Sequence, residues 1–133
     1  MRDAAREAAL REKGAELLHL PAEGGARVEL RALLAALAER ECNEIHLEAG
    51  ARLAGAFLAA DLVDELLLYQ APVLLGEGRP IAALGAFSSL AQGTRLRWLQ
   101  RKDVGEDMRL RAIVCGHEDS ASAEAPDDTY NQQ

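Results

Sequence analysis

Residues 48–56 are the part of this sequence best suited to binding an anionic ligand. They read Glu-Ala-Gly-Ala-Arg-Leu-Ala-Gly-Ala. Gly50 has no Cβ, so backbone and ligand can approach each other closely there. The free N–H groups and the dipole at the start of a following helix favour a phosphate. Such turns also occur with nothing bound, so the turn alone leaves a purely structural role open.

Glu48 is the second candidate for chemistry in the same stretch. Ile45 and Leu47 predict a buried strand over 44–48, and the apolar spacing after Arg52 predicts a helix over 51–61. Glu48 would then stand at the carboxyl end of a parallel strand, where open α/β sheets bind ligands. Its carboxylate could accept hydrogen bonds from substrate hydroxyl or amine groups, or it could be a solvated strand-end acid.

Metal binding and nucleophilic catalysis find little support in the sequence. His46 and Glu48 would share one side of a strand, and His19 is the only candidate for a third ligand. A metal site needs at least that third ligand in suitable geometry. We therefore predict no metal site. No Ser/His/Asp or Cys/His set is arranged for nucleophilic catalysis.

The elements that position these residues are predicted to alternate between helix and strand. Leucines at helical spacing predict the second helix, and three consecutive leucines, Leu66 to Leu68, predict a central strand buried on both faces. Strand–helix–strand at this spacing implies parallel strands with right-handed crossovers. The predicted elements are helices over 2–13, 28–41 and 51–61 and strands over 15–20, 44–48 and 64–70.

A hairpin is predicted near the C-terminal end, with strands 94–103 and 108–115 around the turn 104–107. A loop over 76–85 and a short helical turn over 86–91 precede it. Alternation gives the hairpin one apolar face and one basic face. A phosphate or partner site is possible there, but we favour the simpler interpretation, a solvated sheet face whose charges discourage edge aggregation. The arginines assigned to this face are Arg95, Arg97, Arg101, Arg109 and Arg111.

Composition limits the classes of function. The 133 residues suffice for one domain, and the net charge of −7 argues against a nucleic-acid binder. No apolar run is long enough to span a membrane, and the first residues do not resemble a signal peptide. Cys42 and Cys115 suit a reducing cytoplasm as separate thiols. We expect a domain over 1–115, followed by a disordered acidic tail over 116–133.

One block of the sequence resembles a known family. Its parts are Glu48-Ala49-Gly50, Leu53-Ala54-Gly55-Ala56-Phe57-Leu58, Leu62-Val63-Asp64-Glu65-Leu66, Ala71-Pro72 and Leu75-Gly76. In order and spacing it is similar to the C-terminal part of the reductase domain of bacterial riboflavin-biosynthesis deaminase/reductase proteins. The family more often has glycine where this chain has Ala49. The resemblance extends from about residue 15 to residue 114.

The resemblance implies a fold, a reaction and site residues. The fold would be α/β and dihydrofolate-reductase-like. The reaction would be NADPH-dependent reduction of the ribosyl side chain of 5-amino-6-(5-phosphoribosylamino)uracil to ribityl. Glu48 would contact the substrate, while the catalytic residues stay unassigned. The cofactor would be contacted by Gly50, Ala51, Arg52, Leu53, Ala54, Gly55 and Ala56.

The resemblance also implies that the chain is part of a larger unit. It covers only the second half of the reductase domain, and the zinc deaminase signature of the family is not in this sequence. We therefore expect a fragment that is not active alone and that self-associates through an exposed apolar edge. Two alternatives stay open: a non-catalytic dimerisation or interaction module, and another dihydrofolate-reductase-like NADPH enzyme.

Overall fold

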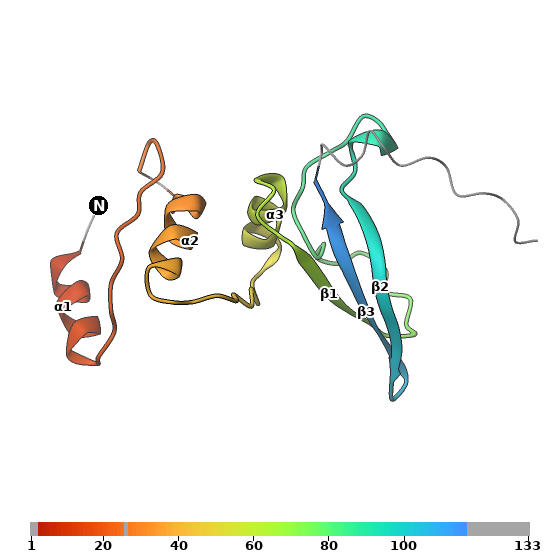
Figure 1. The fold of residues 1–133 in the computed structure, drawn as a ribbon, viewed down its shortest axis with the longest axis horizontal. Coiled ribbons are helices and arrows are strands. Elements are labelled where there is room, and N and C mark those ends of the chain that lie inside the picture. The colour runs from red at the N-terminus through yellow and green to blue at the C-terminus, as the bar shows by residue number, and fades with distance from the viewer. Residues whose placement is uncertain (1–2, 26, 117–133) are drawn as a thin grey trace, which may run out of the picture. The chain divides into compact units, whose positions relative to one another are not determined.

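The structure is a computed structural model that describes residues 3–25 and 27–116. The chain divides into two compact units, residues 1–46 and 47–133 (Figure 1). Helices α1 (Ala4–Glu12) and α2 (Leu30–Ala38) belong to the first unit. The second unit holds helix α3, the short 3-10 helix η1 and a sheet. Their bounds are α3 Ala51–Ala59, β1 Glu65–Gln70, η1 Leu90–Gln92, β2 Arg95–Val104 and β3 Asp107–Cys115.

Side-chain caps define the helix starts of the first unit. The Asp3 carboxylate accepts a hydrogen bond from the N–H of Arg6 at 3.1 Å, before α1. The Glu29 carboxylate accepts from the N–H groups of Arg31 and Ala32, before α2. Such caps satisfy N–H groups that have no partner within the helix. Neither helix contains a buried residue, so these local bonds matter more here than packing does.

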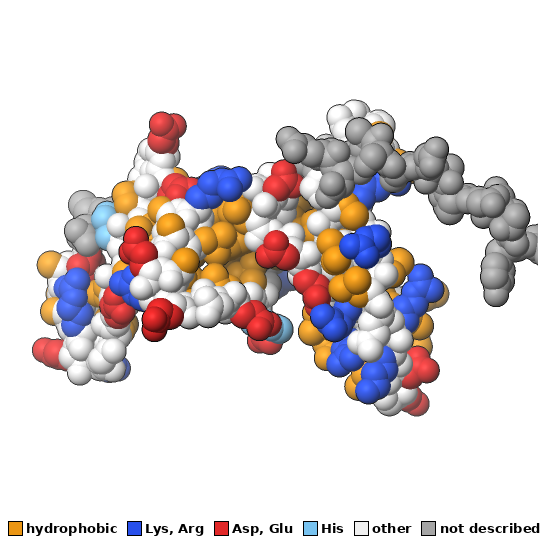
Figure 2. All heavy atoms as spheres, viewed as in Figure 1, with side chains coloured by type: hydrophobic (Ala, Val, Ile, Leu, Met, Phe, Trp, Pro, Cys, Tyr) orange, Lys and Arg blue, Asp and Glu red, His pale blue; other side chains and the backbone are white. Residues whose placement is uncertain are grey.

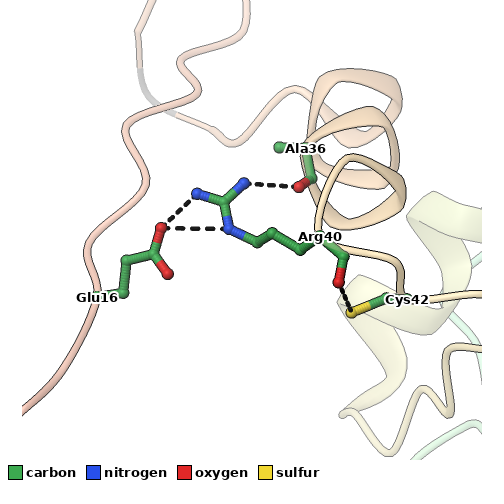
Figure 3. A network of polar contacts seen from close by, with 4 residues as sticks. All are labelled: Glu16, Ala36, Arg40 and Cys42. Atoms are coloured by element: carbon green, nitrogen blue, oxygen red, sulfur yellow. Dashed lines mark hydrogen bonds and ion pairs between the residues drawn. The ribbon is translucent and has the colours of Figure 1, made fainter.

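One ion pair ties the segment before α2 to the end of that helix. The Arg40 guanidinium donates to the Glu16 carboxylate through Nε at 3.2 Å and also through Nη2 (Figure 3). Its Nη1 donates to the carbonyl of Ala36 at 2.7 Å, which fixes the side chain against the last turn of α2. The hydrogen bond from Arg40 holds the pKa of the Glu16 carboxyl below its ordinary value.

The sheet of the second unit is antiparallel, in the order β1-β3-β2. β3 is central, and Leu110 pairs with Leu68 of β1 and Arg101 of β2. A β-bulge interrupts the β2–β3 ladder between Trp98 and Gln100. Among the described residues, the buried hydrophobic side chains are those of Leu110, Ala112 and, from α3, Phe57. β3 supplies two of these three residues because it alone has a neighbouring strand on each side.

The α/β class, the three helices, the position of strand β1 and the C-terminal hairpin are confirmed. The prediction that this strand is central and buried on both faces is wrong, because β1 lies at the edge of the sheet and Leu67 is 41% exposed. The predicted loop over 76–85 is irregular, and η1 falls at the end of the predicted helical turn. The Gly105 φ of 63° suits the tight turn that joins β2 to β3. The predicted tail lies outside the described residues, apart from Gly116.

The predicted parallel pairing is wrong for the described residues. Neither 15–20 nor 44–48 is a strand, and β1 pairs with β3 in antiparallel fashion. A segment becomes a strand only when a neighbour takes up its backbone hydrogen bonds. Ile45 and Leu47 are 43% and 38% exposed, so their alternation is not matched by burial. β1 takes its partner from the hairpin, which follows it in the sequence.

Candidate functional site at the start of helix α3

Gly50 is the N-cap residue of α3. It provides no side-chain cap, and its φ and ψ of −69° and 163° are extended. The Gly50 carbonyl accepts from the N–H groups of Leu53 at 3.1 Å and Ala54 at 3.2 Å. The N–H groups of Ala51 and Arg52 come before the first of these hydrogen bonds in the helix. They therefore lack acceptors within the helix. A helix start of this kind suits an anionic group.

The space beside Gly50 is open. A Cβ placed on this residue would meet no heavy atom of the protein within 4 Å. The φ of Gly50 is −69°, a value that residues other than glycine also adopt. Gly50 is therefore not required by the fold of the described residues. A close approach of a ligand is a physical reason for glycine at this position.

Gly55 lies in a different environment from Gly50, although both belong to the predicted cofactor segment. Gly55 is buried, and a Cβ on it would lie 2.4 Å from the carbonyl oxygen of Ala83. The N–H of Ala83 donates to the carbonyl of Ala51 at 2.8 Å. Two contacts therefore hold the loop at Ala83 against the first turns of α3. This loop contact could not be predicted from the sequence, because it joins residues far apart in the chain.

The remaining residues of the predicted cofactor segment, 50–56, differ in how exposed their side chains are. Arg52, Leu53 and Ala56 are exposed, and Ala51 and Ala54 are half-buried. The exposed residues are accessible to a ligand, whereas Gly55 supports the segment from behind. Glu48 is exposed and lies in the irregular stretch before α3, two residues from the helix N-cap. The structure thus keeps Glu48 and Gly50 adjacent without the predicted strand.

A cavity of the second unit lies away from residues 48–56. It has a volume of about 460 Å³ and is lined by Asp61, Asp64, Leu99 and Val114, among others. None of its lining residues belongs to 48–56. The start of α3 is the better candidate for an anion, because its backbone geometry suits one, whereas the carboxylates of Asp61, Asp64 and Glu65 line the cavity. Among the described residues, no three His, Cys, Asp or Glu side chains are grouped so that they could hold a metal.

A pair that sequence reasoning missed joins β1 to β3. The Arg111 guanidinium donates to both oxygens of the Glu65 carboxylate, each at 2.7 Å. This fork geometry is the strong form of an arginine–carboxylate contact. The hydrogen bond from Arg111 holds the pKa of the Glu65 carboxyl below its ordinary value. The register of β1 against β3 was needed to find the pair, and the sequence did not supply that register.

The described residues form an α/β domain in which the start of helix α3 has no side-chain cap. The pattern of the family described as RibD C-terminal domain matches residues 3–110. The chain belongs to this family. No described helix is long and apolar enough to cross a membrane.

Individual relatives agree with this family. The chain is 38% identical over 87 residues to the riboflavin biosynthesis protein RibD of Escherichia coli, covering 65% of this chain and 24% of the relative. It is 31% identical over 85 residues to a 5-amino-6-(5-phosphoribosylamino)uracil reductase of Buchnera aphidicola. This match covers 63% of this chain and 41% of the relative. A solved structure of Acinetobacter baumannii RibD is similar, with a TM-score of 0.71 and 32% sequence identity. The match covers 82% of this chain and 29% of the RibD chain. The chain thus spans well under half the length of each.

Proposed function

We propose that this chain is the C-terminal half of an NADPH-dependent reductase domain that acts in riboflavin biosynthesis. Its substrate would be 5-amino-6-(5-phosphoribosylamino)uracil, whose ribosyl side chain is reduced to ribityl. The Buchnera aphidicola relative carries that substrate and reaction in its name, which supports the proposal. The observation that carries it is the helix start at Gly50, with an uncapped first turn and open space beside it.

The described residues fit a dinucleotide phosphate in a specific way. The N–H groups of Ala51 and Arg52 would bind the diphosphate, and Gly50 would let it approach the backbone. Bound NADPH would supply the hydride that reduces the sugar carbon. Glu48 would accept hydrogen bonds from substrate hydroxyl or amine groups. The protein's contribution would be the placement of the two molecules against each other.

The proposal also includes a cytoplasmic location and a homo-oligomeric state. The free thiols of Cys42 and Cys115 support a cytoplasmic location as part of this proposal. A homo-oligomer would cover apolar side chains that the described residues leave exposed, such as Leu74 at 102% and Leu75 at 83%. This exposure also favours the second candidate function, an interaction module without catalysis. The third candidate function is that of another dihydrofolate-reductase-like NADPH enzyme.

A chimaera separates these candidates. Residues 3–110 would replace the matching segment of the Escherichia coli relative, and NADPH oxidation would be followed with the pyrimidine substrate. The proposal predicts a folded chimaera with reductase activity that Glu48→Gln lowers. A folded chimaera that binds no NADPH would favour the interaction module. NADPH binding without turnover of this substrate would favour another reductase of the same fold.

A further inference from the structure

One face of the sheet is strongly basic. Arg109 and Arg111 of β3 point to the same side because alternate residues of a strand share a face. Three cations of β2 lie on that side too, because Lys102 pairs with Arg109, Arg97 with Ile113 and Arg95 with Cys115. The basic face is therefore defined by Arg95, Arg97, Lys102, Arg109 and Arg111. Lys and Arg side chains gather over the hairpin in Figure 2.

This composition corrects the basic face expected from the sequence. Arg101 pairs with Leu110 and so belongs to the opposite face, where its guanidinium lies 5.7 Å from the ring centre of Trp98. Lys102 takes its place, in register with Arg109. The bulge between Trp98 and Gln100 shifts the alternation of β2 by one residue, which the sequence pattern did not reveal.

Negative charge on the basic face is scarce among the described residues. Glu65 pairs with Arg111, and Asp107 lies at the hairpin turn. Arg109 donates to Gln100 at 2.9 Å, while its Nε is buried without a partner in the described part of the chain. Arg95, Arg97 and Lys102 are exposed and form no ion pair with a described residue. The face is therefore suited to an acidic occupant.

The sequence contains a segment with complementary charge next to this face. Residues 117–133 lie outside the described part of the chain, and they follow Gly116 directly. They carry five acidic residues and neither lysine nor arginine. Cys115, the last residue of β3, is in register with Arg95, so the segment starts beside the first cation of the basic face.

Length and charge favour this segment over a second copy of the sheet. Seventeen extended residues could reach on the order of 60 Å, and a nine-residue strand is about 30 Å long. The segment could therefore run the whole length of β3. A second copy meeting this face with its own basic face would bring like charges together, which is unfavourable.

We propose that residues 117–133 form an intramolecular acidic cover on the basic face. The cover rests on several exposed charge pairs, each weak and screened by salt. Its physical role is to neutralise a sheet face that would otherwise attract anionic partners. The cover should consequently be present at low ionic strength and lost at high ionic strength.

The test compares backbone amide NMR spectra of the full chain with those of a tail variant whose acids are made neutral. At about 0.01 M salt, where charges act over about 30 Å, amides of residues 95–102 and 109–111 should shift between the two proteins. At about 1 M salt, where the range falls to about 3 Å, the spectra should coincide there. The tail variant carries Glu118→Gln, Asp119→Asn, Glu124→Gln, Asp127→Asn and Asp128→Asn.

A control variant separates a contact from net charge. It neutralises the same number of acids in the first unit, at Glu12, Glu23, Glu39, Glu41 and Glu44, and should leave the hairpin amides unchanged. Reversal of two cations, Arg95→Glu with Arg97→Glu, should abolish the response to tail neutralisation. Identical hairpin spectra of parent and tail variant at low salt would overturn the proposal. Equal shifts in the control variant would overturn it as well.

Discussion

Gly55 of α3 and Ala83 of the following loop are in backbone contact: a Cβ on Gly55 would lie within 2.8 Å of the nitrogen, carbonyl carbon and oxygen of Ala83. The Ala83 N–H also donates to Ala51 at 2.8 Å. Backbone atoms cannot rotate away as a side chain can. The contact therefore fixes the loop at the start of α3, where the cofactor segment lies.

Gly55→Ala should destabilise the protein. The added methyl meets backbone, and overpacking of this kind costs about 1–3 kcal/mol. The higher helix propensity of alanine offsets about 1 kcal/mol of this destabilisation at most. Urea unfolding followed by circular dichroism should show a lower midpoint. The control is Gly50→Ala, where the space is open. An unchanged or higher midpoint for Gly55→Ala would show that the loop does not lie against α3.

The Glu65–Arg111 pair predicts a pH dependence of stability. Because the hydrogen bond from Arg111 lowers the pKa of Glu65 below its ordinary value, the folded state favours the ionised carboxylate. The stabilisation is present above the ordinary pKa and is lost as pH falls through the lowered one. Unfolding midpoints of parent and Glu65→Gln should differ at neutral pH and converge in acid. The exposed Glu106 at the hairpin turn provides the control, Glu106→Gln. A difference independent of pH would contradict the assignment.

Self-association is expected from the exposed apolar side chains. Sedimentation velocity at micromolar concentration should show a dimer or a larger species. Leu74→Ser with Leu75→Ser removes two strongly exposed leucines and should shift the distribution towards monomer. Glu77→Gln in the same loop should have no effect. A monomeric parent with well-dispersed NMR signals would count against this expectation.

Much of the local structure could be read from the sequence. Leucine spacing located α2, and alternation with a glycine turn located the hairpin. The sheet topology could not be predicted, because strand pairing depends on partners far away in the chain. Segment 44–48 has strand-like residues but no ladder in the described residues. Local propensity therefore identified a possible strand and could not supply its neighbour.

The start of helix α3 after Gly50 was predicted correctly, since it depends on adjacent residues. The assignment of Glu48 and residues 50–56 to a binding site stays a prediction. Gly50 and Gly55 looked equivalent in the sequence, and the structure separates them into an open and a buried glycine. That difference arises from the loop at Ala83, whose position follows from tertiary packing. Whether the segment contacts NADPH stays a prediction.

Glu48→Gln should separate substrate use from cofactor binding. Glutamine keeps the size of the side chain and loses the charge that would hold a substrate hydroxyl or amine. In the chimaera with the Escherichia coli relative we expect kcat/KM for the pyrimidine to fall, with NADPH affinity nearly unchanged. Glu44→Gln, four residues earlier, is a matched control. A loss of NADPH affinity in Glu48→Gln, or full substrate use, would show that the assigned role is wrong.

The most direct test of the cofactor site is the NADPH dissociation constant of the chimaera with and without Gly50→Val. Valine fits the extended φ of −69° and the open space at Gly50, so the fold should be retained, as circular dichroism would verify. Its branched Cβ would occupy the position where the diphosphate approaches. We predict a rise in Kd of about tenfold, equivalent to about 1.4 kcal/mol, and no change for the control Gly78→Val, which also has open space. The isolated chain should bind NADPH weakly or not at all. Equal Kd values for the folded parent and Gly50→Val chimaeras would contradict the assignment of α3 to the cofactor.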